Sequence, residues 1–553
     1  MTQLSRYTGP LLALLAAICF IPFLGNAHLF DWDEINFAEI AREMIATGNW
    51  AEPQMGFTAF TEKPPLFFWL QALSMKCFGV NEFAARLPNA LLGMLVLPFL
   101  FYIGKKLKDH RLGFLWALAY WGSLLPHLYF KSGIIDPYFN FFIFAGLIAL
   151  FKAGQEDQRK KNPVWWVFTG GVFTGLAILT KGPVGLLIPG LVLAVLTVLK
   201  RFRFPLSFRL LLGWFLVTLA TTATWFAFNY FQNGPDFIRE FTIRQWALLT
   251  TPDAGQKGFF LYHVVVLFFG CFPASSFFIH GWRLKTITNE TEQRFLLWMK
   301  VLFAVVLILF SLVTTKIVHY SSLTYFPLSF LAAWSLYGIL YQGVALPRWL
   351  KFSLLFSALP FILFPVLITW GGMHLEQIKP LFSKDQFASE NLEAVIHWTG
   401  WEALPGILLL LVLVLFIWGN KKWRGGTRFL LLFFGTALYI QAVLFFLINR
   451  IEAISQRAHI EFWESCQDKD AYYMSYGFKT YTYYFYGKMR PPTNTQYHDR
   501  NWLYHGSLDK PLYFSSKVQS VKYIGKDIPD AEFLYHKNGF YFFRRPPFSE
   551  NVK

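Results

Sequence analysis

The chain has few charged residues and very few cysteines for its length. Of its 553 residues, 15% are charged and four are cysteine, namely Cys19, Cys77, Cys271 and Cys466. These cysteines are widely spaced and include no CxxC pair, which argues against a disulfide framework and against a zinc site of that type. The sequence also contains no internal repeat and no low-complexity segment. Long hydrophobic runs are therefore its dominant feature.

Hydrophobic residues make up 55% of the chain, against about 45–50% in a soluble domain. A bilayer-spanning helix needs about 20 apolar residues, and about 13 runs approach or reach that length. They lie near 9–30, 87–104, 112–130, 134–151, 164–180, 183–199, 210–233, 258–280, 296–315, 320–341, 352–372, 403–419 and 428–448. The first run shows no small-residue cleavage site, so we expect a retained helix. The sequence predicts a polytopic α-helical membrane protein with about 13 transmembrane helices.

Basic residues gather in alternate loops, all on the side of the N-terminus. Examples are Lys105-Lys106, Lys160-Lys161, Lys200-Arg201, Arg283 with Lys285, and Lys421-Lys422. Positive loops mark the cytoplasmic side, so the loop 31–86 and the tail from about residue 450 face outward. The net charge of +17 is spread over these short loops, and we expect no nucleic-acid partner. We divide the chain into a transmembrane catalytic domain, 1–449, and an outer domain, 450–553.

The first outer loop has helical periodicity. Phe37, Ile40, Ala41, Met44 and Ile45 recur at the spacing of one helix face. The pattern predicts a short amphipathic helix lying in the membrane interface. Its start and stop are clear in the sequence, because Asp33 suits an N-cap and Gly48 a helix end. A second helix is expected from about residue 65 to 78.

The tail is polar and rich in tyrosine. Segments 471–476 and 481–486 alternate tyrosine with other residues, as strands do, and Asn538-Gly539 separates two apolar runs. An Asn-Gly pair in that setting indicates a β-hairpin. The tail is predicted to form a C-terminal extracytoplasmic α/β domain.

Ionisable residues of interest collect at the outer ends of the hydrophobic runs. They are Asp33, Glu34, Glu62, Lys63, Asp136, Lys181, Arg239, Arg244, Lys316, His319 and Tyr320. Charged groups at a membrane are costly to desolvate and usually have a function. Carboxylates beside several cations on one outer face suit an anionic lipid headgroup and a reaction on it.

Each of these residues also has a structural interpretation. Asp33 is a favoured helix cap, Asp136 before Pro137 suits a turn, and Lys181 can extend its stem along apolar surface. For His263, at a membrane edge, a structural role is favoured over ligation. The shared outer face is what favours function.

Four segments together resemble a known family. They are Asp33-Glu34, Phe37 through Met44, Glu62-Lys63-Pro64-Pro65-Leu66 and Glu82 through Leu87, and the resemblance extends to Leu179 through Gly185 and Lys316 through Pro327. These residues resemble the undecaprenyl-phosphate aminoarabinose:lipid A transferases. That family belongs with the protein O-mannosyltransferases in the GT-C class of membrane glycosyltransferases. The resemblance implies 13 spans, interfacial helices in the first outer loop and an outer α/β domain.

The resemblance also implies an activity and a site. Family members move a sugar from a polyprenyl phosphate to an envelope acceptor, such as a lipid A-type glycolipid, with inversion. Asp33 and Asp136 would be the catalytic acidic residues. The candidate substrate-binding residues are Glu34, Lys63, Arg42, Arg86, Lys181, Lys316, Tyr320 and Tyr325. Some members hold a metal through a glutamate that matches Glu62 and an outer-loop histidine, here His263, so zinc, magnesium or manganese is the candidate cofactor.

The expected partners are a polyprenyl-phosphate sugar donor, a lipid or protein acceptor and membrane lipids. We expect a monomer in the bacterial inner membrane with its active site on the periplasmic side. One alternative is a protein O-mannosyltransferase-like enzyme acting on Ser or Thr. Another is a lipid or solute transporter, although transporters carry mid-membrane charges and repeats that this sequence does not show. A third is an envelope scaffold that binds partners through its tail.

Overall fold

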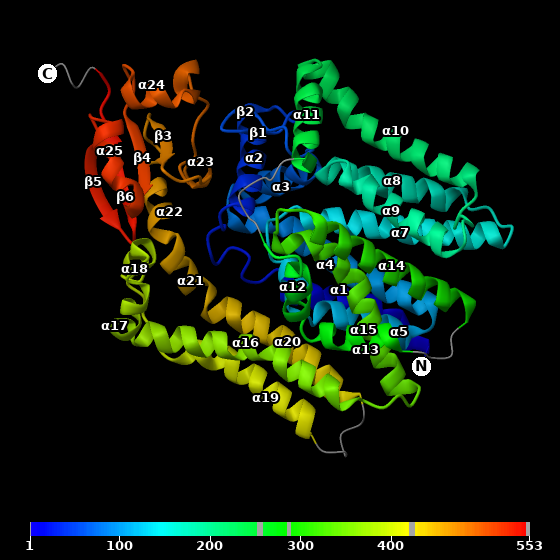
Figure 1. Ribbon diagram of the computed structural model, residues 1–553. Helices are drawn as coiled ribbons and strands as arrows, with labels where there is room; N and C mark the ends of the chain where they lie inside the picture. The colour runs from blue at the N-terminus through cyan, green and yellow to red at the C-terminus, as the bar shows by residue number, and fades with distance from the viewer. Residues whose placement is uncertain (1, 251–257, 285–288, 420–425, 549–553) are drawn as a thin grey trace.

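The computed structural model describes residues 2–250, 258–284, 289–419 and 426–548 (Figure 1). Within these residues, nine helices are long and apolar enough to cross a membrane. They are α4 (Glu82–Leu107), α7 (Asp136–Gln158), α8 (Val164–Lys181), α10 (Phe208–Asn233), α14 (Glu290–Leu312), α15 (Tyr325–Tyr341) with the preceding 3-10 turn η1 (Val318–Thr324), α16 (Arg348–Met373), α19 (Leu404–Trp418) with η3 (Trp401–Ala403), and α20 (Thr427–Phe446). The chain is an integral membrane protein.

The other predicted runs also coincide with helices, but with shorter or broken ones. Two are the single helices α1 (Thr2–Phe20) and α9 (Val184–Leu199). Run 112–130 is split into α5 (His110–Trp121) and α6 (Leu124–Tyr129), and run 258–280 into α12 (Tyr262–Gly270) and α13 (Ala274–Arg283). The second pair bends by 111° just before Pro273, which cannot donate a backbone hydrogen bond. If this pair forms one span, the described residues contain ten candidate membrane spans. The total of 13 spans stays a prediction.

Aromatic side chains form the centre of the bundle. The Trp116 ring of α5 meets Phe144 of α7, Phe295 of α14 and Phe330 of α15, with centroid distances of 6.0, 6.0 and 4.9 Å. The rings of Phe144 and Phe326 stack 4.3 Å apart. By contrast, α10 and α16 expose many large apolar side chains, such as Phe231 and Phe352. Exposed apolar surface of this kind suits contact with lipid.

The first outer loop holds α2 (Asp33–Thr47), a hairpin of β1 (Gln54–Met55) and β2 (Thr58–Ala59), and α3 (Leu66–Phe78). Both predicted helices are confirmed, and Gly48 ends α2 in the left-handed conformation, with φ 73°. The expectation that Asp33 caps the helix is wrong, because Trp32 holds the cap position and Asp33 is the first helical residue. Helix α2 is buried on every side from Glu34 to Met44, so its polar face contacts protein, and its position in the membrane interface stays a prediction.

The C-terminal domain covers the polar side of α2. Its four-stranded sheet has the order β3 (Tyr472–Tyr476), β4 (Leu512–Lys517), β6 (Phe540–Arg545) and β5 (Glu532–Lys537). Strands β3 and β4 are parallel, from Tyr472↔Leu512 to Tyr476↔Ser516, while β6 is antiparallel to both β4 and β5. The predicted hairpin is confirmed, with Asn538 and Gly539 both at positive φ.

Segment 481–486, expected to be extended, instead contains the short helix α23 (Thr482–Phe485). The hydroxyl of Thr480 accepts a hydrogen bond from the Thr482 amide, and local capping of this kind competes with strand pairing. The remaining helices of the outer part are α11 (Asp236–Thr250), α17 (Leu375–Ile378), α18 (Gln386–Asn391), α21 (Ile448–Ser455), α22 (Arg457–Glu464), α24 (Arg500–His505) and α25 (Val521–Asp527), with the 3-10 turns η2 (Lys379–Phe382), η4 (Thr495–His498) and η5 (Val518–Ser520).

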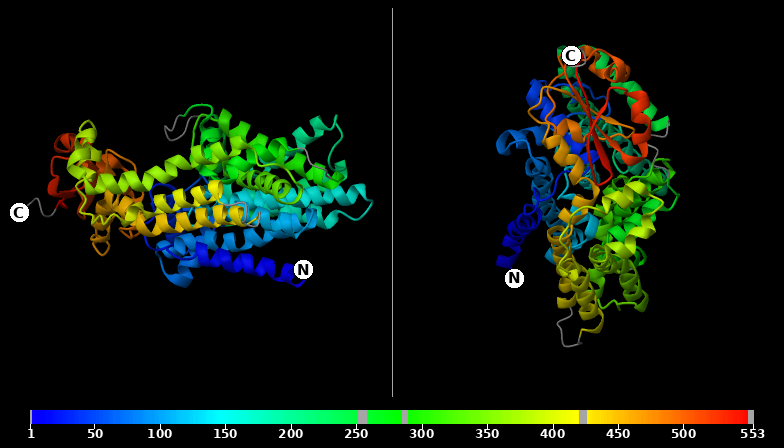
Figure 2. Two further views of the ribbon diagram at one scale, coloured as in Figure 1. Left: turned by 90° about the horizontal axis from the view of Figure 1, so that it is seen from below. Right: turned by 90° about the vertical axis from the view of Figure 1, so that its left-hand side faces the viewer.

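Figure 2 shows the helical bundle as an elongated body, with the sheet domain at one end and the N-terminus away from it. Helices α21 and α22 lead from α20 into the domain. At this junction His28 Nδ1 lies 2.8 Å from Glu452 Oε1, and Gln456 donates to the carbonyl of Leu29. The first outer loop is therefore held between the bundle and the sheet domain.

Candidate active site

Asp33 lies at the start of α2 with a partly exposed side chain, 39% accessible. One of its carboxylate oxygens, Oδ2, is 3.4 Å from Nε2 of His319 in η1. The same histidine nitrogen lies 3.8 Å from Oδ2 of Asp136. The structure thus brings the two predicted catalytic carboxylates together at the same nitrogen of one imidazole.

Asp136 is the buried member of the pair. It begins α7, where Pro137 occupies the first turn without leaving a backbone donor unpaired. Its Oδ1 accepts a hydrogen bond from Lys181 Nζ at 2.5 Å. Lys181 ends α8, and its ammonium also lies 5.4 Å from the centre of the Tyr320 ring and 5.7 Å from that of Phe139. A lysine held this way is a fixed cation at the membrane edge.

His319 is a site residue to which the sequence pattern assigned no role. Its backbone carbonyl accepts hydrogen bonds from Tyr129, at 3.3 Å, and from the Ser322 hydroxyl. Ser322 is itself bonded by Asn140 of α7 at 2.7 Å. The only sequence signal was its place, three residues after Lys316 at the outer end of a hydrophobic run. No local sequence pattern indicates that the His319 ring lies close to both aspartates.

Lys63 is the second cation near the carboxylates. Burial lowers the pKa of its ammonium and nearby Lys181 lowers it further, while the charges of Glu62, Asp33 and Asp136 act in the opposite direction. Its neighbour Glu62 is engaged elsewhere, since Arg244 Nη2 of α11 lies 2.5 Å from Glu62 Oε1. Lys63 and Lys181 together make the region beside Asp136 attractive to an anion.

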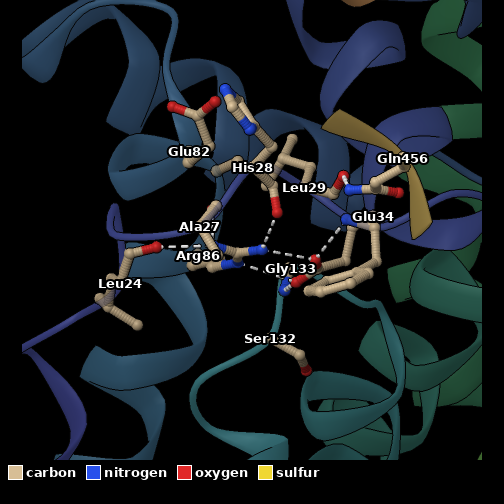
Figure 3. A network of polar contacts seen from close by, with 12 residues as sticks. Leu24, Ala27, His28, Leu29, Glu34, Glu82, Arg86, Ser132, Gly133 and Gln456 are labelled. Carbon is tan, nitrogen blue, oxygen red and sulfur yellow. Dashed lines mark hydrogen bonds and ion pairs between the residues drawn. The ribbon is translucent and has the colours of Figure 1, made fainter. Parts of the chain in front are cut away.

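Glu34, the neighbour of Asp33, points into a separate buried network (Figure 3). Arg86 donates to both of its oxygens, at 3.0 and 2.8 Å, and the amides of Phe30 and Gly133 donate at 3.0 and 2.6 Å. Burial alone would raise the pKa of Glu34, but Arg86 and these amides hold it below its usual value. Arg86 also donates to the carbonyls of Leu24 and Ala27 at 2.7 Å. The Glu34–Arg86 pair therefore fixes the turn before α2.

Three other residues predicted to bind substrate are in contact with other groups of the protein. Arg42 bonds both oxygens of Glu39 and the carbonyl of Met489. Lys316 donates to three carbonyls at the end of α14, those of residues 310, 311 and 313. Tyr325 is fully buried beside Tyr129, at 5.3 Å between ring centres. The geometry gives these residues structural partners, and their contact with substrate stays a prediction.

The two candidate metal ligands do not form a metal centre. His263 is buried on α12, with Nδ1 at 3.1 Å from the Ser321 hydroxyl, and Glu62 is paired with Arg244. Within the part of the chain that the structure describes, no group of three or more His, Cys, Asp or Glu side chains is arranged to hold a metal ion. The donor set does not fit the ion that the resemblance implied, so we derive no reaction step through it.

The arrangement of a helical membrane bundle with a sheet-containing C-terminal domain matches that of a solved structure. ArnT from Cupriavidus metallidurans, bound to undecaprenyl phosphate, superimposes with a TM-score of 0.73 over 97% of both chains at 18% identity. Residues 62–227 match the family described as dolichyl-phosphate-mannose-protein mannosyltransferase. The fold of this chain is therefore that of ArnT.

Sequence relatives narrow the class further. The undecaprenyl phosphate-alpha-4-amino-4-deoxy-L-arabinose arabinosyl transferase of Erwinia tasmaniensis is 27% identical over 433 residues, 75% of this chain and 73% of that protein. The second such transferase of Proteus mirabilis is 26% identical over 273 residues, and the match spans about half of each protein, 49% of this chain and 48% of the other. The predicted resemblance is confirmed: the chain is a relative of the aminoarabinose transferases.

Proposed function

We propose that the chain is an inverting glycosyltransferase that moves a sugar from a polyprenyl-phosphate donor to an envelope acceptor of the lipid A type. The observation that carries this proposal is the convergence of Asp33, His319 and Asp136 beside Lys181 and Lys63. These residues come from five segments that are distant in the chain. The names of the relatives, which are pentose transferases using a lipid-linked donor, support the choice of substrates.

The chemistry follows from the charges of the site. In the transfer, the bond between the anomeric carbon and the phosphate oxygen breaks, and the electron pair leaves with the lipid phosphate. Lys181 and Lys63 are placed to stabilise that developing charge. The acceptor oxygen attacks the opposite face of the anomeric carbon, so the configuration inverts. Asp136 holds Lys181 in position through a contact of 2.5 Å.

Asp33 is assigned to the acceptor. A hydroxyl acceptor must lose a proton, and a carboxylate in contact with an imidazole is suited to receive it. A phosphate acceptor is already ionised and needs only correct placement. In both cases the partly exposed Asp33 faces the acceptor, while buried Asp136 faces the cations. His319 connects the two carboxylates and orients them.

A second candidate is supported by the family match of residues 62–227, whose description names a protein mannosyltransferase. This activity would use the same donor chemistry with a Ser or Thr hydroxyl as acceptor. Under either proposal the site faces the periplasmic side of the bacterial inner membrane, and the chain acts as a monomer.

The test is transfer by the purified protein in detergent. It uses a panel of undecaprenyl-phosphate sugars with lipid A or Ser/Thr peptides as acceptors, each with and without a chelator. We expect sugar transfer to lipid A that chelation leaves unchanged. Asp33→Asn should reduce kcat by at least about 100-fold while the protein stays folded. Asp468→Asn, an exposed change on the outer domain, is the matched control. Transfer retained by Asp33→Asn would contradict the mechanism, and transfer to peptides alone would favour the second candidate.

A further inference from the structure

A cavity of about 340 Å³ lies between the C-terminal domain and the hairpin of the first outer loop. Its lining includes Met55 from β1 and, from the domain, Lys479, Tyr481, Tyr484 and Arg500. The volume is in the range of small-molecule sites, roughly 300–1,000 Å³. The reaction described above does not use this cavity.

The walls of the cavity are held in place from both sides. The Tyr484 hydroxyl would lie only 2.7 Å from a Cβ at Gly56, so the hairpin and the domain meet without space for a side chain there. Gly56 and Phe57 donate their amides to Glu43 of α2 at 2.6 and 2.8 Å. The hairpin is thereby tied to the helix that begins at Asp33.

The charge of the cavity is positive. Lys479 and Arg500 both line it, and none of the described lining residues is acidic. Within the described ranges of the chain, neither cation forms an ion pair with an Asp or Glu, and both side chains are exposed. Tyrosine rings beside uncompensated cations suit a phosphorylated sugar, because the rings cover its apolar face and the cations bind the phosphate oxygens.

The cavity is connected to the catalytic aspartate through Trp32. The Tyr481 ring meets the Trp32 ring edge-on at 6.1 Å, and Lys479 Nζ lies 5.0 Å from the centre of the same indole. The Tyr481 amide also faces Asp31 Oδ1 at 3.4 Å. Trp32 is followed directly by Asp33. The cavity thus adjoins the residue that leads into Asp33, whereas Lys181 bonds Asp136 and Lys63 lies near both carboxylates.

We propose that this cavity binds the phosphorylated sugar headgroup of the acceptor, an inference that rests on the proposed transferase function. The donor phosphate then occupies the Lys63 and Lys181 side, and the acceptor phosphate is bound by Lys479 and Arg500. Two separate cationic positions explain how one site accommodates two anionic lipids without exchanging them. The domain therefore contributes acceptor specificity, and the membrane bundle supplies the chemistry.

The test measures initial rates with Lys479→Gln, Arg500→Gln and the double variant. Acceptor concentration is varied at saturating donor, and donor concentration at saturating acceptor, with lipid A carrying two phosphates or one. We expect the KM for the bisphosphorylated acceptor to rise about 10-fold for each single change, with the KM for the donor and kcat within about twofold. The preference for two phosphates over one should disappear. Lys526→Gln, an exposed change on α25 of the same domain, should match the wild type.

Direct binding of bisphosphorylated lipid A to the detergent-solubilised protein provides a readout that does not need turnover. We expect the double variant to bind it at least about 10-fold more weakly. An unchanged KM and unchanged binding would overturn the inference while leaving the transferase proposal intact. A rise in the KM of the donor instead would assign the cavity to the donor and also overturn it. Wild-type protein that binds lipid A but transfers no sugar to it would reject the transferase function alone.

Discussion

At the scale of single residues, the site depends on one imidazole between two carboxylates of different exposure. Asp33 is 39% accessible on its side chain and Asp136 is 3% accessible, and His319 lies within 3.4 and 3.8 Å of them. Lys181 compensates the buried charge directly. Two chemically identical groups can therefore have different tasks, because one faces the cations and the other faces open space.

Removal of the imidazole should affect turnover more than binding. We expect His319→Ala to lower kcat about 100-fold with little change in the donor KM, because the ring orients Asp33 and does not bind the lipid. His319→Gln, which retains an N–H group toward Asp33, should recover part of the loss. His505→Ala, an exposed histidine on α24, is the control. Steady-state kinetics of the three variants measure the effect, and a His319→Ala enzyme within twofold of wild type would exclude the assigned role.

At the scale of elements, buried charged groups hold α2 in place, and this helix carries Asp33, the aspartate that we propose to be catalytic. Glu34 is neutralised by Arg86 from α4, and Glu39 by Arg42 within the helix. Glu43 binds the hairpin amides instead. Burial, followed by repulsion from Glu39, raises the pKa of Glu43 to about 9. The helix is anchored at its start, its middle and its end.

The raised pKa of Glu43 predicts a pH dependence of stability. In the unfolded chain this carboxyl ionises near its ordinary value, whereas in the folded protein it keeps its proton up to about pH 9. Between these values only the folded state retains the proton, so its contribution to stability is lost as pH rises through that window. Glu43→Gln cannot ionise, and its melting temperature should fall less than that of wild type between about pH 5 and pH 9.

Thermal melting of the detergent-solubilised protein across this pH range is the measurement. Glu376→Gln, the same substitution at an exposed position of α17, should follow the wild-type curve. A Glu43→Gln curve parallel to that of wild type would show that the side chain is ionised in the folded protein at neutral pH.

At the scale of the whole molecule, a sheet-containing C-terminal domain packs at one end of a membrane bundle. The domain contacts α2 through α23 and the Arg42–Met489 bond. It also lines the cavity beside Trp32. This arrangement separates donor chemistry, which depends on the membrane helices, from acceptor recognition, which we assign to the domain.

The proposed orientation can be tested by labelling in intact cells. In a variant whose four cysteines are replaced by serine, Lys526→Cys should react with a membrane-impermeant maleimide from the periplasmic side. Lys106→Cys, in the last turn of α4, should react only after the membrane is opened. The positive loops predict this result because basic residues stay on the cytoplasmic side. Labelling of Lys106→Cys in closed cells would reverse the orientation and place the site in the cytoplasm.

Features that depend on neighbouring residues could be predicted from the sequence. Helix α3 and the hairpin at Asn538-Gly539 were predicted near their observed positions, because turn residues and apolar periodicity act locally. The environment of α2 could not be predicted in this way. Its polar face, with Glu39, Arg42 and Glu43, resembles the solvent-facing side of an interfacial helix. It is buried by the hairpin of the same loop and by a domain more than 400 residues later.

The sequence by itself determined that this is a membrane protein with carboxylates and cations at the ends of its apolar runs, because a long apolar run enters the bilayer whatever its neighbours are. Only the tertiary structure decided which member of the Asp33-Glu34 pair faces the site. Adjacent helical residues point about 100° apart, and Arg86, 52 positions away, neutralises Glu34 and leaves Asp33 beside His319. Such a pairing depends on how helices pack, and local sequence carries no signature of it.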